Sequence, residues 1–173
     1  MYREKKRTVS KTQKPLILSA LFTAMTVVLT SFVKIPIGNG YIHTGDCVIY
    51  LASCILPFPY AIFVAAIGGA LSDALTGYVI FIIPTIIIKP LITLPYTPKN
   101  NTILTTQNAI MTIPAGAITV IGYFITGLIL YGWSGAIIEL FGNTIQAAGS
   151  AVLFLLLAVT LDKIGFKQKI EHK

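Results

Sequence analysis

The sequence predicts an all-α integral membrane protein, built as a compact bundle of six transmembrane helices. Only 11% of its residues are charged, whereas soluble domains carry about 25%. Its apolar residues form long blocks without helical or strand alternation, so the helices present no polar face to water. Six spans of about 20 residues use roughly 120 positions, which leaves short loops in a chain of 173 residues. We therefore expect one membrane domain over residues 1–173.

The first helix is expected over residues 16–33, with Pro15 suited to its first turn. A basic segment, residues 1–14, precedes it in the way that the charged region of a signal peptide would. The apolar stretch is, however, longer than the core of a signal peptide and lacks a small-x-small cleavage site. We therefore interpret it as a retained span.

The other five spans are delimited by glycine, proline and polar residues that interrupt the apolar blocks. The second span is short, because it starts at Gly45 or Asp46 and ends before the P-F-P sequence at 57–59. The remaining spans are expected at 60–76, 78–95, 109–131 and 136–161, with a polar connection at 95–108 and a tight turn at 131–135. A basic tail, residues 162–173, follows the last span.

The basic residues predict the orientation of the bundle. Six lie before the first helix, Lys99 lies in the polar connection and four lie in the tail. With six spans these three regions share one side, and the opposite side has only Lys34, while Lys89 falls within a span. The positive-inside rule then places both termini in the cytoplasm of a bacterial cell.

Ionisable side chains within spans are costly and usually mark function. The acidic residues of the hydrophobic region, Asp46, Asp73 and Glu139, all fall in the outer third of the predicted bundle. Asn143 and Gln146 follow Glu139 at helical spacing and share its face. The sequence therefore predicts a small-molecule pocket between the helices that opens to the outside.

Each of these residues also has a purely structural interpretation. Asp46 could cap the second helix, and His43, one turn before it, could bond to a loop carbonyl. Asn143 could bond to a neighbouring helix, but it lies too deep for interfacial water, which favours a polar binding face. Lys89 lies too far from the cytoplasmic end to reach water, so it is expected to pair with an acidic residue or to shape the pocket floor.

The composition of the pocket indicates the ligand. The only arginines, Arg3 and Arg7, lie in the N-terminal segment, so no guanidinium is available to hold a phosphate or carboxylate. Acidic and amide groups among tyrosines suit a neutral or weakly basic, hydrogen-bonding aromatic molecule. The residues expected to bind it are Asn39, His43, Asp46, Asp73, Tyr78, Glu139, Asn143 and Gln146.

Catalytic and metal-binding motifs are not supported. G-W-S-G at 132–135 matches the G-x-S-G string of rhomboid proteases, but the only later histidine, His172, lies in the tail. There is no phosphate loop for ATP hydrolysis and no paired metal motif. Cys47 and Cys54 are two helical turns apart, about 10 Å, which is too far for a disulfide. We expect neither an enzyme nor a metal site.

Ala20 and Ala24 form a small-x-x-x-small face near the cytoplasmic end of the first helix, where a separate subunit could dock. Further along stand Y-I-H-T-G-D-C-V-I-Y-L-A, I-G-G-A-L-S-D-A-L-T-G-Y, I-I-P-T-I-I-I-K-P-L and E-L-F-G-N-T-I-Q-A-A-G. With these strings in this order, nearly the whole chain resembles the substrate-binding (S) components of energy-coupling factor (ECF) vitamin transporters.

The resemblance implies a subunit that binds a vitamin or precursor from outside and docks through its first helix onto a transmembrane coupling subunit and two cytoplasmic ATPases. Ala20 and Ala24 would form the docking face. Segment 37–46 would act as a flexible lid, with Gly38, Gly40 and Gly45 as hinges. The chain would need no cofactor of its own, because the partners use ATP, and no nucleic acid would be involved.

The subgroup resembles members linked with hydroxymethylpyrimidine, the thiamin precursor, or with pyridoxine, and riboflavin remains an alternative substrate. Two other functional classes stay open. A self-contained ion- or proton-coupled carrier would use Asp73 and Glu139 as proton sites. A membrane enzyme would use Asp46 and His43, but no nucleophile or metal set accompanies them.

Overall fold

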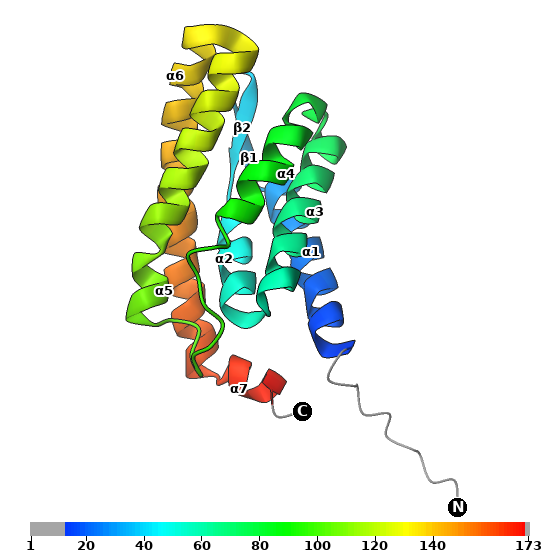
Figure 1. Cartoon of the computed structure of the whole chain (residues 1–173), viewed down its shortest axis with the longest axis vertical. Helices are drawn as coiled ribbons and strands as arrows, with labels where there is room; N and C mark the ends of the chain where they lie inside the picture. Colours follow the sequence, from blue (N-terminus) through cyan, green and yellow to red (C-terminus); the bar gives the residue numbers. More distant parts are fainter. Residues whose placement is uncertain (1–12, 172–173) are drawn as a thin grey trace, which may run out of the picture.

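Helices make up most of residues 13–171, the part of the chain that the computed structural model describes. Their order is α1 (Gln13–Phe32), α2 (Asp46–Ile55), α3 (Phe58–Thr76), α4 (Ile82–Leu91), α5 (Thr106–Ile110), α6 (Thr112–Lys163) and α7 (Phe166–Glu171). Figure 1 shows the start of α1 and helix α7 at one end of the molecule, and the bend of α6 at the other. The basic residues before Gln13 lie outside the described part.

The expected fifth and sixth spans form one element, α6, which is broken at a single residue. Gly132 has non-helical angles there, with φ 70° and ψ −164°, in a region that favours glycine. The chain reverses at this point, within the predicted turn at 131–135, and the two arms of α6 run side by side (Figure 1). The fourth span is shorter than predicted, because a 3-10 turn at Val79–Phe81 precedes α4 and the helix ends at Leu91.

The prediction of an all-α fold is wrong at residues 34–43. Here β1 (Lys34–Ile37) and β2 (Gly40–His43) form an antiparallel hairpin. Gly38 and Asn39 make the two-residue turn, and Gly38 has a φ of 55°, as tight hairpin turns require. A Gly-Asn pair between two short runs of this kind is a hairpin signal, which the long apolar blocks on either side obscured.

Three helical stretches are long and apolar enough to cross a membrane: α1, α3 and residues 106–163. Since α6 folds back at Gly132, the last stretch has the length of two crossings. Helix α2 and the stretch 79–91 are apolar but shorter than the roughly 20 residues that a bilayer requires. The count of six spans therefore stays a prediction, with two of its members being short helices.

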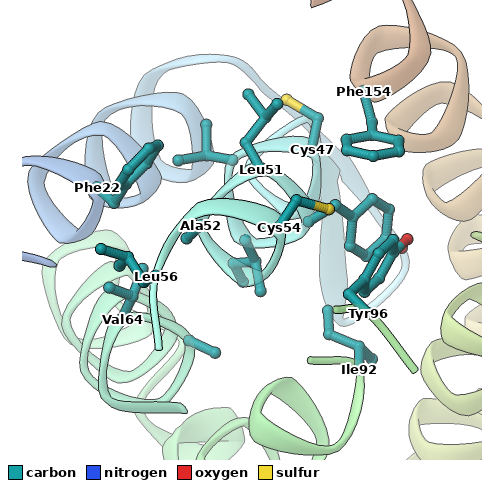
Figure 2. Close-up of a cluster of buried hydrophobic side chains, with 14 of the residues drawn as sticks. Phe22, Cys47, Leu51, Ala52, Cys54, Leu56, Val64, Ile92, Tyr96 and Phe154 are labelled. Carbon is teal, nitrogen blue, oxygen red and sulfur yellow. The ribbon is translucent and has the colours of Figure 1, made fainter. Parts of the chain in front are cut away.

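Helix α2 lies at the centre of the bundle, since all its residues except Ile55 are buried. Tyr50 on α2 stacks on Tyr96, with ring centroids 5.1 Å apart, and Phe154 meets both rings edge-on. Figure 2 shows α2 among side chains of this core, with Phe22 and Phe154 on separate helices around it. The cysteines of α2 are both buried and unpaired, so they serve as apolar packing residues.

Side chains in the C-terminal part of the chain form hydrogen bonds with the polar connection between α4 and α5. Lys167 is buried, and its Nζ donates hydrogen bonds to the carbonyl oxygens of Cys54 (2.8 Å), Pro98 (2.7 Å) and Asn100 (2.5 Å). The Asp162 carboxylate accepts the backbone N–H groups of residues 103 and 104, both at 2.8 Å. These contacts also give the C-terminal end of α2 a partner for one of its open carbonyls.

We expect Lys167→Met to lower the free energy of unfolding by about 3 kcal/mol, because it leaves three carbonyl oxygens without their charged donor. The measurement is chemical or thermal unfolding in detergent micelles. Lys169→Met is the matched control, since Lys169 lies on the same helix and is exposed. Equal stability of the two variants would contradict this role for Lys167.

Candidate functional site

A polar cavity lies between α1, the hairpin, α2, α3, α4 and both arms of α6. Its empty space, including the part open to the surroundings, is about 450 Å³. The lining residues are Thr26, Thr30, Gly40, Tyr41, His43, Asp46, Ile49, Gly69, Asp73, Phe81, Thr85, Lys89, Tyr123, Glu139, Asn143 and Gln146.

Six of the eight residues predicted to bind ligand line this cavity: His43, Asp46, Asp73, Glu139, Asn143 and Gln146. The other two do not. Asn39 is exposed at the hairpin turn, because a two-residue turn directs its central residues away from the sheet. Tyr78 is not a lining residue, although its ring centroid is 4.6 Å from that of Tyr41, which is one.

An ion pair between Asp46 and Lys89 lies at the floor of the cavity, and both side chains are buried. Lys89 Nζ is 2.6 Å from Asp46 Oδ1, and Gln146 Nε2 donates to Asp46 Oδ2 at 2.9 Å. The expected pairing of Lys89 with an acidic residue is thus confirmed. The capping role considered for Asp46 is wrong, because Gly45 occupies the cap position and no side chain caps the helix.

His43 connects the hairpin to α6. Its backbone N–H donates to Gln146 Oε1 at 3.1 Å, and its ring Nδ1 accepts the backbone N–H of Gly45 at 3.1 Å. Enclosure of the ring in the protein, and then the nearby Lys89 ammonium, lower the pKa of His43 to about 3. The ring is therefore neutral near pH 7, with Nδ1 as acceptor and Nε2–H available as a donor.

Asp73 on α3 receives one hydrogen bond and has a second oxygen free. The hydroxyl of Tyr41, in the hairpin, donates to Asp73 Oδ1 at 2.7 Å. Burial, followed by the neighbouring Asp73 charge, raises the pKa of Tyr41 well above its ordinary value, so the hydroxyl stays protonated. Asp73 Oδ2 is buried and has no partner within hydrogen-bond distance among the described residues, although the nearby Thr85 hydroxyl also interacts with this carboxylate. An acceptor of this kind needs a donor from a bound molecule or water.

Glu139 and Asn143 form a second polar pair on α6. Asn143 Nδ2 donates to Glu139 Oε2 and to the Glu139 carbonyl, both at 2.9 Å. The hairpin packs closely on this arm, since a Cβ added at Gly40 would lie 2.9 Å from Glu139 Oε1. A Cβ at Gly45 would overlap Thr30 Oγ1. These glycines, predicted as hinges, thus have a packing role that the sequence did not reveal.

Several lining residues were not among the predicted ligand contacts. Thr85 and Tyr123 share a hydrogen bond of 2.9 Å between their hydroxyls, and Lys89 Nζ lies 5.2 Å from the Tyr123 ring centroid. Thr26 and Thr30 lie four residues apart on one buried face of α1. The spacing of Thr26 and Thr30 could have indicated that they share one face of the helix. Threonine and tyrosine are, however, so common in apolar helices that the residue types by themselves do not indicate a site.

Apolar helices around a buried cavity that contains three carboxylates are typical of a multi-pass membrane protein. No group of three or more potential metal ligands occurs in residues 13–171. The family described as "ECF-type riboflavin transporter, S component" matches residues 10–163. The chain therefore belongs to the family of ECF transporter S components, as the resemblance of its motifs implied.

One curated relative adds a second comparison. An uncharacterized protein of the gap 3′ region of Pyrococcus woesei is 29% identical over 132 residues, which are 73% of this chain and 86% of the relative.

The family is one of transporter components and not of enzymes. As an S component, the chain is the substrate-binding subunit of an ECF transporter, which works with a membrane coupling subunit and ATPases.

We expect Lys89→Met to lower the free energy of unfolding by about 3–5 kcal/mol, because it leaves the buried Asp46 carboxylate without its counter-charge. The double variant Asp46→Asn/Lys89→Met removes both charges and should recover a large part of that loss. Unfolding of the wild type, both single variants and the double variant in detergent measures the coupling between the two residues. Additive losses would show that the two groups do not interact in the membrane protein.

Proposed function

We propose that this S component captures a small, unphosphorylated heteroaromatic vitamin or precursor, with hydroxymethylpyrimidine or pyridoxine favoured. The observation that carries the proposal is the buried Oδ2 of Asp73, which has no partner within hydrogen-bond distance, on a residue that lines the cavity together with a second carboxylate, Glu139. A ligand that donates hydrogen bonds through hydroxyl or amino groups complements both carboxylates. A phosphate or carboxylate on the ligand would be repelled by them.

The other lining groups support a single aromatic ring. Phe81, Tyr123 and Tyr41 provide faces against which a ring can pack. The Nε2–H of His43 and the remaining N–H groups of Lys89 can donate to ring nitrogens or to hydroxyl oxygens of the ligand. Asp46 acts indirectly in this arrangement, because its two oxygens accept from Lys89 and Gln146 and hold those donors in place.

Riboflavin is the second candidate, and the description of the matching family favours it. The hairpin would act as the lid over either ligand, because Gly40, Tyr41 and His43 all line the cavity. We place the opening of the cavity outside the cell and both termini in the cytoplasm, from the predicted distribution of basic residues.

Mass spectrometry of the small molecules that co-purify with the chain, followed by calorimetric titration with hydroxymethylpyrimidine, pyridoxine and riboflavin, tests the proposal. We expect one of the two single-ring compounds to bind at least tenfold more tightly than riboflavin. A phosphorylated or strongly anionic ligand would contradict the inference that the two carboxylates select a ligand with hydrogen-bond donors. Movement of substrate by the isolated chain along an ion gradient would favour the self-contained carrier instead.

Asp73→Asn should weaken binding of the true ligand by about tenfold to a hundredfold, because a charged hydrogen bond is lost and an amide N–H can oppose the donor of the ligand. Titration of the wild type and the variant measures this loss. The thermal stability of the ligand-free variant should not fall, since the buried carboxylate is only half satisfied. A fall in stability with unchanged affinity would assign Asp73 a structural role only.

Helix α1 supports the predicted docking of the coupling subunit. Ala20 and Ala24 are both exposed, and large apolar side chains flank them, with Leu21 52% and Ile17 56% exposed. Small residues on an exposed apolar face let another helix approach closely. We assign this face to the transmembrane coupling subunit, which in turn binds the two ATPases.

Ala20→Trp combined with Ala24→Trp should abolish co-purification of the coupling subunit and the ATPases, because two indole rings prevent close helix approach. Ligand binding by the isolated chain should stay within about twofold of the wild type, since neither residue lines the cavity. Leu75→Trp is the control, because Leu75 is 71% exposed on another helix. Retention of the partners by the double variant would refute the assignment.

A further inference from the structure

The two faces of the hairpin meet different parts of the bundle. One face packs directly on the second arm of α6, where a Cβ added at Gly142 would lie 3.1 Å from Ile37 and 3.3 Å from Ile42. The hairpin turn contacts the same arm, because a Cβ added at Gly38 would overlap Ile138. Contacts this close are those of a packed protein interior, so the hairpin and this arm of α6 form one packed unit.

The other face of the hairpin meets the end of α3 through side chains. Lys34 lies opposite His43 in the strand register, and Tyr41 lies two residues before His43, so all three side chains are on this face. The Tyr41 hydroxyl donates to Asp73 at 2.7 Å, and the Tyr41 ring centroid is 4.6 Å from that of Tyr78. These side-chain interactions form the hairpin–α3 contact.

The Lys34 ammonium lies across the hairpin–α3 contact. Its Nζ is 5.3 Å from the ring centroid of Tyr41 and 5.6 Å from that of Tyr78, within the range of a cation–π interaction with each ring. Tyr78 belongs to the bundle, since its N–H donates to the Asp73 carbonyl at 2.9 Å and its ring centroid is 6.5 Å from that of Phe81. Lys34 has no carboxylate partner among residues 13–171. Its ammonium therefore joins one ring of the hairpin to one ring of the bundle.

The two faces differ in what their separation costs. Moving the hairpin off α6 breaks packed contacts and the 3.1 Å hydrogen bond from His43 to Gln146, and it leaves voids whose walls lose dispersion contacts. Moving it off α3 breaks one hydrogen bond and the ring contacts of Lys34 and Tyr41, whose polar groups water can then solvate. Local opening begins where packed apolar contacts are fewest, which is the hairpin–α3 contact.

We propose that the cavity opens at the hairpin–α3 contact while the hairpin stays on α6, and that Lys34 sets the rates at which a small molecule enters and leaves. Neither Lys34 nor Tyr78 lines the cavity, so both act as positioning residues through Tyr41, which does. Lys34 stabilises the closed hairpin equally with an empty or a filled cavity, so it changes both rates and leaves the affinity almost unaltered. The effect on a vitamin rests on the proposed function, whereas the movement of the hairpin does not.

Distances between pairs of spin labels, measured by double electron–electron resonance on the full chain without vitamin, test the movement. One label replaces Asn39, which is exposed at the hairpin turn. The second replaces either Leu75 on α3 or Phe141 on α6, which are 71% and 65% exposed. Lys34→Met should increase the population of long hairpin–α3 distances about fivefold, as loss of a partly desolvated cation–π contact implies. The hairpin–α6 distances should stay as in the wild type.

The rates are measured by stopped-flow binding and release of whichever of hydroxymethylpyrimidine, pyridoxine and riboflavin binds the wild type. Lys34→Met should raise both rate constants about fivefold and keep the dissociation constant within about twofold. Lys34→Arg keeps the cation and should behave as the wild type. Tyr78→Phe keeps the ring and should do the same, whereas Tyr78→Leu should resemble Lys34→Met. Lys99→Met is the control for net charge, since Lys99 is exposed in the polar connection.

The melting temperature of each variant shows whether the fold is kept, and labelling of the unmodified chain shows whether its two buried cysteines react. Unchanged distances in Lys34→Met would overturn the proposal, as would longer hairpin–α6 distances in that variant. Weaker binding with an unchanged rate of entry would also overturn it, because Lys34 would then support the ligand or the fold and not the opening. If none of the three compounds binds, the proposed function fails, while the label distances still decide how the hairpin moves.

Discussion

The fold depends on a pair of opposite charges that is buried inside an apolar bundle and is stabilised there by further hydrogen bonds. A single buried charge is strongly destabilising, whereas a pair with additional hydrogen bonds is tolerated. Asp46 at the start of α2 and Lys89 on α4 form that pair at 2.6 Å, and Gln146 from α6 occupies the second carboxylate oxygen. Since Gln146 also accepts the N–H of His43, one set of contacts fixes α2, α4, α6 and the hairpin relative to one another.

A similar solution is found at the opposite end of α2. This helix is only ten residues long and almost wholly buried, so its terminal polar groups cannot be hydrated in the usual way. Lys89 serves the side chain at its first residue, and Lys167 serves the carbonyl of Cys54 near its last. Two lysines from distant parts of the chain thus allow a short helix to lie in the centre of the bundle and to form the floor of the cavity.

The helix positions could be predicted because glycine and polar residues interrupt the apolar blocks, as Gly77 and Gly132 show. The convergence of Asp46, Asp73 and Glu139 could also be predicted, because their depth follows from helix direction alone. The particular residues with which these acidic side chains pair could not be predicted. Gln146 lies 100 residues from Asp46, and a helix that is apolar on all faces contains no periodicity from which its rotation could be read. The hairpin was missed because a Gly-Asn turn is a weak signal beside two long apolar segments.

Under the proposed function, Asp73 links the hairpin and the ligand through one carboxylate. The Tyr41 hydroxyl, which belongs to the hairpin, donates to Oδ1 at 2.7 Å, while Oδ2 has no partner within hydrogen-bond distance in the described structure. When a donor from the ligand reaches Oδ2, it removes the cost of a half-satisfied buried carboxylate. The same carboxylate is fully satisfied only when the hairpin is closed and the ligand is bound. Under the proposed function, closure of the hairpin and recognition of a hydrogen-bond donor on the vitamin are therefore coupled through Asp73, and a ligand without that donor gains less from closure.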